Sequence, residues 1–293
     1  MQKISTDRFF IYLYGMSFSA SEARRKRIGA EKKGMNMNIK LKSMKRIVMM
    51  SAVATALLAA GCNRGEKTVA PSIETVEFSA EAAEPSPYTV TAAYCRITNA
   101  DDSTVLTAIE RANRERIFGA EATADLQADF DAMVERLAGE YVCCDEELSH
   151  SFTYQFSALQ NCETTRGGTI LCYQTSYYIY TGGAHGLGSV EYDCYDLTTG
   201  QRYEFGYLGE DEWAPAVRQL ISERLNAEYG EELFGTTPET AYVPSAVRIT
   251  DTGLLLEYQP YEVAPYCVGI VGIELTDDQI AATGAPLIWI DEK

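Results

Sequence analysis

Histidine is scarce in this chain, whose 293 residues contain only His150 and His185. A metal site built on histidine needs several ligands close together, and a histidine general base needs a nucleophile and an orienting carboxylate within reach. The G-x-S-x-G motif that presents a nucleophilic serine is also missing. We therefore predict no catalytic residue, no metal and no cofactor, and we expect that the protein is not an enzyme.

The N-terminal region lacks an apolar run of the roughly 20 residues that a transmembrane helix needs. Its run from Ile47 to Ala60 follows two basic residues and ends before Cys62, an order typical of an export signal. The segment LAAGC resembles the signal box of bacterial lipoproteins, which implies that Cys62 is lipidated. We predict that residues 1–61 are an over-extended start plus this signal peptide, with the true start at Met44, or at Met35 or Met37. A chance apolar run before a buried cysteine is the alternative.

Basic residues are few after this signal. The first 62 residues hold 12 of the 25 Lys+Arg and 3 of the 42 Asp+Glu, so residues 63–293 carry 13 basic and 39 acidic residues, a net charge of −26. Such a field repels phosphate backbones and anionic lipids and attracts cations. We expect cationic partners, no nucleic acid, and membrane contact through the lipid anchor only. Alternatively, the acidity only keeps the protein soluble.

The cysteines lack the spacing of a zinc site, since Cys143 and Cys144 are adjacent and no histidine pair follows. Disulfides are allowed in an exported protein. If a hairpin turns about residue 183, residues whose numbers sum to 366 face each other. Cys172 and Cys194 should then be neighbours across two strands, close enough for a disulfide or a buried thiol pair.

The remaining pattern predicts an α+β fold, with antiparallel sheets and about three helices packed on one face. Residues 62–87, from Cys62 onward, have little to bury and are predicted to be a flexible linker. Residues 88–180 would form an N-terminal α+β portion and residues 181–293 a C-terminal portion. Period-two and helical patterns predict strands at 88–97, 152–158, 169–180, 189–197, 246–250 and 254–258, and helices starting near 103, 126 and 213.

Three motifs occur in order within Tyr154 to Leu275: YTGGAHG, DLTTGQ and GLLLEYQPYEVAPYCVG. Together they resemble the extracellular domain of lysozyme-sensing anti-sigma factors of the RsiV type and the accessory domain of peptidoglycan deacetylases of the PdaC type. The catalytic histidines of those deacetylases lie in a separate domain. The resemblance therefore implies binding, either of a lysozyme-like cationic protein or of cell-wall glycan.

The candidate binding residues come from two of these motifs. They are Tyr178, Tyr180, Gly182, Gly183 and His185 around the glycine turn, and Tyr261, Glu262 and Tyr266 in the later tyrosine-proline run. Rigid tyrosines can fill a partner's pocket or stack on sugars. The alternatives are structural, because the glycines can simply make a turn, the later run can cover a sheet edge, and Glu262 can face water.

We therefore expect a non-catalytic lipoprotein of the bacterial cell envelope that binds a lysozyme-like hydrolase, as an inhibitor or a sensor. Asn63 and Arg64 follow the lipidated cysteine in place of the acidic run that is often associated with surface export in some lipoprotein-rich bacteria. We therefore expect an anchor that faces the periplasm. The alternative is a protein that binds or processes peptidoglycan or another glycan, as a wall hydrolase or esterase. That activity would need His185 or the carboxylates of Glu210, Asp211 and Glu212 to lie in a cleft.

Overall fold

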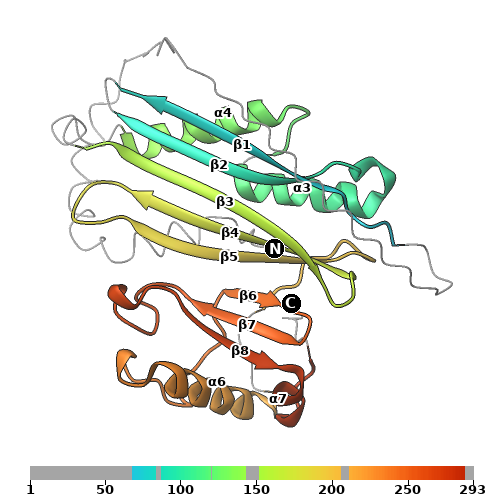
Figure 1. Ribbon diagram of the computed structural model, residues 1–293, viewed down its shortest axis with the longest axis vertical. Coiled ribbons are helices and arrows are strands. Elements are labelled where there is room, and N and C mark those ends of the chain that lie inside the picture. Colours follow the sequence, from blue (N-terminus) through green and yellow to red (C-terminus); the bar gives the residue numbers. More distant parts are fainter. Residues whose placement is uncertain (1–67, 84–86, 120, 143–151, 206–210, 288–293) are drawn as a thin grey trace, which may run out of the picture.

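The computed structural model describes residues 68–83, 87–119, 121–142, 152–205 and 211–287. In these residues eight strands form two sheets, with helices packed against them (Figure 1). The five-stranded sheet has the order β1 (Ile73–Ala82), β2 (Tyr88–Ile97), β3 (Tyr154–Thr165), β4 (Ile170–Tyr180), β5 (Leu187–Asp196), and the three-stranded sheet has the order β6 (Ala246–Ile249), β7 (Gly253–Tyr258), β8 (Val271–Thr276). The α-helices are α3 (Thr104–Phe118), α4 (Leu126–Leu137), α6 (Ala214–Tyr229) and α7 (Asp277–Ala282), with shorter helical turns at Ala100–Asp102, Ala138–Val142, Gly230–Glu232 and Tyr266–Val268. The predicted α+β class is confirmed.

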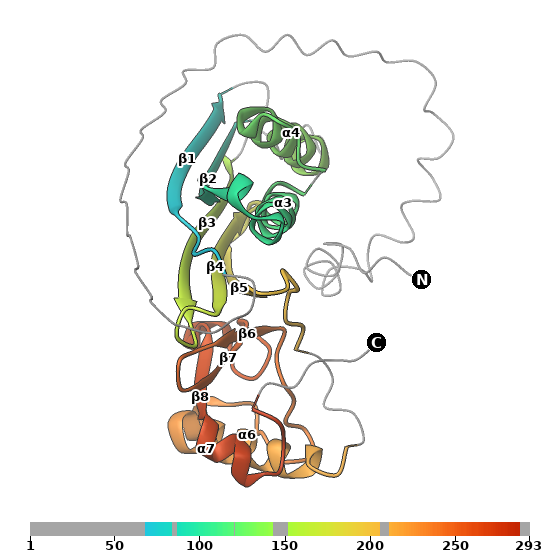
Figure 2. The same cartoon turned by 90° about the vertical axis from the view of Figure 1, so that its right-hand side faces the viewer.

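Helices α3 and α4 cover one face of the five-stranded sheet (Figure 2). Helix α3 begins where the Ser103 side chain accepts a hydrogen bond from the backbone N–H of Val105, so Ser103 is its N-terminal cap. Its apolar stripe, including Leu106 and Ile109, is buried against the sheet. Helix α4 is capped in the same way by Asp125. Capping and apolar spacing thus fix both helices where the sequence predicts them.

Strand β1 corrects the prediction that residues 62–87 are a flexible linker. Ile73–Ala82 pair antiparallel with β2 over the whole strand. Phe78 and Ala80 point into the core, while Glu77 and Ser79, which alternate with them, are exposed. The composition of the segment is polar, but strict alternation gives it the one apolar face that an antiparallel edge strand needs. Cys62 and the predicted signal peptide lie outside the described residues.

The pairing of β2 with β3 also differs from the expected antiparallel order. The two strands run parallel, from Tyr88↔Tyr154 to Ala93↔Leu159. Parallel neighbours need a long crossover, and α3 and α4 supply it between these strands. All other strand pairs within the two sheets are antiparallel.

The register of the β4–β5 hairpin confirms the prediction for its cysteines. Cys172 lies directly opposite Cys194. Both are buried, and both are free thiols in the structure. The predicted division between residues 180 and 181 falls inside this hairpin. The chain passes from one sheet to the other later, between β5 and β6.

The two sheets share a hydrophobic core. It combines Ile170, Cys172 and Cys194 of the first sheet with side chains of α6, α7 and the three-stranded sheet. At the surface, the Arg166 side chain donates to Asp277 Oδ1 at 2.8 Å, and its backbone N–H donates to Asp251 Oδ1 at 2.6 Å. These contacts tie the β3–β4 turn to the second sheet, so β5 and β6 lie side by side (Figure 1).

Candidate functional site

The two motifs singled out in the sequence meet in space, although 80 residues separate their contacting atoms. The hydroxyl of Tyr266, in the loop between β7 and β8, donates to the backbone oxygen of Gly186 in the β4–β5 turn at 2.8 Å. Earlier in the same loop, the Gln259 side chain accepts from Val190 N at 3.0 Å and donates to Val190 O at 2.7 Å. Gln259 thus takes the place of a neighbouring strand, and the loop is fixed against the edge of β5.

Three rings from the turn and the loop form a stack. The ring of His185 lies on that of Tyr266, with centroids 4.0 Å apart and planes 20° apart. Tyr261 stacks on Tyr266 at 5.6 Å and 29°. His185 is exposed and Tyr261 is 41% exposed, so two rings of the stack present area to solvent. We call His185, Tyr266 and Tyr261 the aromatic stack.

The other predicted residues of the turn shape it from within. Gly182 has φ +96°, and a Cβ added there would lie 2.7 Å from Cε1 of Phe152. The Tyr180 hydroxyl donates to Gly183 O at 2.9 Å. The Tyr178 ring lies so close to Gly186 that an added Cβ would overlap it. At Gly182 the positive φ and the close approach to Phe152 together require glycine, and the turn positions His185.

His185 is positioned by the backbone rather than by a carboxylate. Its Nδ1 lies 2.9 Å from Gly186 O. A carbonyl oxygen only accepts, so Nδ1 carries a proton and donates it to this hydrogen bond. Glu191 and Asp193, the carboxylates of β5 that follow the turn, accept hydrogen bonds from Arg116. His185 thus has a fixed orientation, and its hydrogen-bond partner among the described residues is a backbone oxygen rather than a carboxylate.

Glu262 belongs to the local structure of its loop. Its Oε2 accepts from the backbone N–H of Gln259 at 2.7 Å, and burial raises the pKa of this carboxyl. The neighbouring Tyr261 has φ +73°, a conformation that costs a residue with a Cβ about 1–2 kcal/mol. Strain of this kind persists only where surrounding contacts impose it, and it is common at binding surfaces. Here the residue in this conformation, Tyr261, stacks its ring on that of Tyr266.

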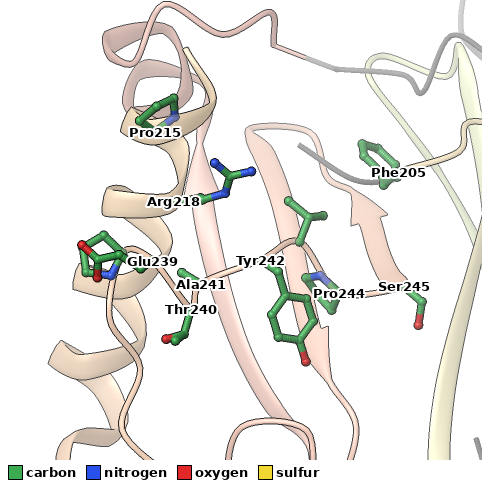
Figure 3. Close-up of a pocket in the computed structure, with 11 residues that line it drawn as sticks. Phe205, Pro215, Arg218, Glu239, Thr240, Ala241, Tyr242, Pro244 and Ser245 are labelled. Carbon is green, nitrogen blue, oxygen red and sulfur yellow. The ribbon is translucent and has the colours of Figure 1, made fainter. Parts of the chain in front are cut away.

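The structure also contains a groove that the sequence did not predict. An open groove of about 780 Å³ lies between α6 and the segment that leads into β6 (Figure 3). Arg218 extends from α6 on one side, and Tyr242 and Pro244 lie on the segment opposite. Tyr242 also lines a separate, smaller hollow with Glu262, which belongs to the loop that carries Tyr261 and Tyr266. Exposed Tyr242, set between Pro238 and Pro244, is the sequence feature that could have indicated it.

Of the carboxylates considered for catalysis, the two that the structure describes do not line this groove. Asp211 and Glu212 are exposed ahead of α6 and are not among the residues that line it. Glu210 and His150 lie outside the described residues. Across the described part of the chain, no helix combines the length and apolar character needed to cross a membrane.

Comparison with known proteins gives a match to a family model in the C-terminal part of the chain. Residues 209–278 match the family described as "Protein of unknown function (DUF3298)". This segment contains α6, the three-stranded sheet and the loop with Tyr261 and Tyr266, but not the turn with His185. No curated protein matches the chain.

Two solved structures are similar over most of their length. A member of the DUF3298 family from Bacteroides fragilis has 16% sequence identity and a TM-score of 0.60, covering 74% of this chain and 94% of that chain. A DUF3298 family protein from Pseudomonas aeruginosa PAO1 has 14% identity and a TM-score of 0.47, covering 71% and 93%. The likeness to the Bacteroides fragilis protein shows that the two chains share a fold.

Proposed function

We propose that this protein is a non-catalytic, lipid-anchored protein of the bacterial cell envelope that binds a lysozyme-like cationic hydrolase, as its inhibitor or its sensor. The observation that carries the proposal is the contact between the glycine turn and the tyrosine-proline loop. These are the segments that resemble the RsiV type of domain, and together they form one exposed aromatic surface.

The aromatic stack suits an anchor for a protein partner because it is formed in advance. The hydroxyl of Tyr266 is held by Gly186, and the loop is held by Gln259. Few side-chain rotations remain to be lost on binding, which improves affinity for a given contact area. Tyrosine also contributes large apolar area at low entropy cost. The net charge of −26 after residue 62 would steer a cationic hydrolase toward this surface.

Glycan binding is the second candidate, and the groove favours it. An open groove lined by Tyr242 and Arg218 could take an extended polymer with a sugar ring against the tyrosine. Glycan processing has less support, because Asp211 and Glu212 are not among the residues that line the groove and, in the described part of the chain, the hydrogen bond of His185 goes to a backbone oxygen.

The test is a calorimetric titration of the chain starting at Asn63 with hen egg-white lysozyme at two salt concentrations. This start keeps β1, which is part of the sheet. We expect saturable binding that weakens at the higher salt but persists, since only the long-range part of the attraction is screened. Absence of heat, or complete loss of binding in salt, would contradict the proposal. A parallel titration with peptidoglycan fragments would then take first place.

Two variants locate the surface. Tyr261→Asn removes a ring of the aromatic stack, and asparagine tolerates the positive φ of this position. We expect it to weaken lysozyme binding at least about 30-fold, as for a central tyrosine anchor worth about 2 kcal/mol or more. Tyr242→Asn is the matched control, since Tyr242 is 40% exposed but lies in the groove. A loss with Tyr242→Asn and none with Tyr261→Asn would assign binding to the groove.

A further inference from the structure

Cys172 and Cys194 form a cross-strand pair at the centre of the shared core. They are directly opposite in the register of β4 and β5, and their exposures are 1% and 2%. Cys267, by comparison, is exposed in the β7–β8 loop. Two cysteines directly opposite each other in one hairpin are candidates for a disulfide.

The hydrogen bonds of the hairpin define which kind of pair this is. Leu197 N donates to Thr169 O at 2.9 Å, and these two residues extend the register directly beyond Ile170↔Asp196. Hydrogen-bonded pairs therefore occur at every second position from Thr169, and Cys172 falls between them. Consistently, the Cys194 carbonyl points away from β4 and accepts from Tyr203 N at 2.8 Å.

A non-hydrogen-bonded position brings the two residues close. The Cα atoms of such a pair lie about 4.5 Å apart, compared with about 5.5 Å for hydrogen-bonded pairs. Disulfides are found at Cα separations of about 4.4–6.8 Å. The pair thus satisfies the distance requirement without movement of the backbone.

The sulfur atoms also face the second sheet. Cys172 Sγ donates to Ile249 O at 3.5 Å, and Ile249 N donates to Cys194 Sγ at 3.5 Å. Both backbone groups of Ile249 on β6 thus use sulfur as their partner. Oxidation would keep Cys194 Sγ as an acceptor and remove only the weak S–H donor to Ile249 O.

We propose that Cys172 and Cys194 form a disulfide that staples β4 to β5 where the two sheets meet. The oxidant is a protein or low-molecular-weight disulfide, as an oxidising compartment supplies, so this inference rests on the proposed envelope location. One thiolate attacks the oxidant disulfide and expels a thiol. The second thiolate then attacks the mixed disulfide and expels the other thiol, so two protein thiols are oxidised and one disulfide is reduced.

The bond should form during folding and then be protected. The hydrogen bond with Cys172, together with burial, raises the pKa of Cys194 well above its ordinary value, so its thiolate is scarce in the folded protein. Once the bond has formed, both of its cysteines are buried, so a reductant should open it only slowly until urea unfolds the chain.

The test uses the full chain, purified from its host after alkylation of free thiols in denaturant without reductant, and then mapped by peptide mass spectrometry. A second sample is refolded from urea in a glutathione redox buffer, which does not depend on location. We expect a peptide that links Cys172 to Cys194 in both samples, two hydrogen atoms lighter than the reduced pair. Alkylated Cys172 and Cys194 in the refolded sample would overturn the geometric argument, and in the host sample alone would overturn oxidation of the native protein.

Two variants complete the test. Cys194→Ser should leave Cys172 as a free, alkylated thiol and lower Tm by about 5–10 °C relative to the oxidised wild type, from the loop that the bond closes. Cys267→Ser is the matched control and should leave the linked peptide unchanged. Lysozyme titration of the oxidised wild type is a separate readout, so failure of the bond and failure of the proposed function are told apart.

Discussion

Glu110 on α3 offers a sharp test of how the helix is bound to the five-stranded sheet. Its side chain is buried, with 9% of the residue exposed. Oε1 accepts from the Tyr94 hydroxyl and Oε2 accepts from Ile97 N, both at 2.8 Å. Tyr94 is itself fully buried. One carboxyl thus satisfies two buried donors of β2.

Two substitutions should have very different effects. In Glu110→Gln the amide oxygen can accept from Ile97 N, while the NH₂ group donates to the Tyr94 hydroxyl oxygen. The Tyr94 hydroxyl then donates to the Glu110 backbone oxygen, which already lies at 3.4 Å. Every group keeps a partner, so we expect a change within about 1 kcal/mol at pH 5. Glu110→Ala leaves Ile97 N unsatisfied and opens a void, for a loss of about 2–4 kcal/mol.

The stability difference between Glu110→Gln and the wild type should change with pH in a defined direction. Burial raises the pKa of Glu110, and the hydrogen bonds from Ile97 and Tyr94 oppose this only in part. Between the unfolded pKa and the raised folded pKa, the folded state holds more protons. The stability of the wild type therefore falls as pH rises through this window. Glutamine does not titrate, so Glu110→Gln should gain stability relative to the wild type from pH 5 to pH 8.

The assay is urea unfolding of the chain from Asn63, followed by intrinsic fluorescence at pH 5 and pH 8. Glu191 and Glu262 also have raised pKa values, so the informative quantity is the difference between variant and wild type at each pH. If Glu110→Gln is as unstable as Glu110→Ala, or if its difference from the wild type does not grow with pH, the reasoning is refuted.

Two further predictions concern the second sheet. In Gly253→Ala the new Cβ would overlap the backbone oxygen of Leu275, so we expect the free energy of unfolding in urea to fall by about 1–3 kcal/mol or more. Gly272→Ala is the control and should be tolerated, because its Cβ would make ordinary contacts to Glu257. Arg166→Ala should cost about 1–3 kcal/mol at pH 7, because it removes the hydrogen bonds to Asp277. The hydrogen bond from Arg166 lowers the pKa of Asp277, so in the wild type the stability from this contact is lost as pH falls through the lowered folded pKa. An equal cost of Arg166→Ala at pH 2 and pH 7 would contradict the role given to this ion pair.

Local patterns predicted most of the secondary structure, and they failed where composition was used in place of pattern. The β4–β5 register follows from a symmetric turn about residue 183, which is why Cys172 could be matched with Cys194. Strand β1 was missed because Glu77 and Glu81 dominate its composition, although Phe78 and Ala80 alternate with them. The parallel pairing of β2 with β3 depends on which strand edge is vacant after the crossover, and no local pattern carries that information.

The candidate site was predictable as two segments but not as one surface. Resemblance to a known family marked the glycine turn and the tyrosine-proline loop, and the structure brings them together through Tyr266 and Gly186. The groove was not predictable, since Phe205, Arg218 and Tyr242 come from three separate segments. No periodicity links residues that meet only after two sheets have packed.

The edge of β5 that faces away from β4 is closed by side chains and a loop, and the aromatic stack lies beside this edge. Val190 points its backbone groups away from β4, as Cys194 does, so an added strand could bind there. Side chains and a loop occupy these positions instead, with Gln259 on Val190 and Tyr203 N on Cys194 O. An edge closed by side chains resists edge-to-edge association. Gln259 also fixes the start of the loop that carries Tyr261 and Tyr266, so the contact that closes the edge also positions the tyrosines of the aromatic stack beside the turn that carries His185.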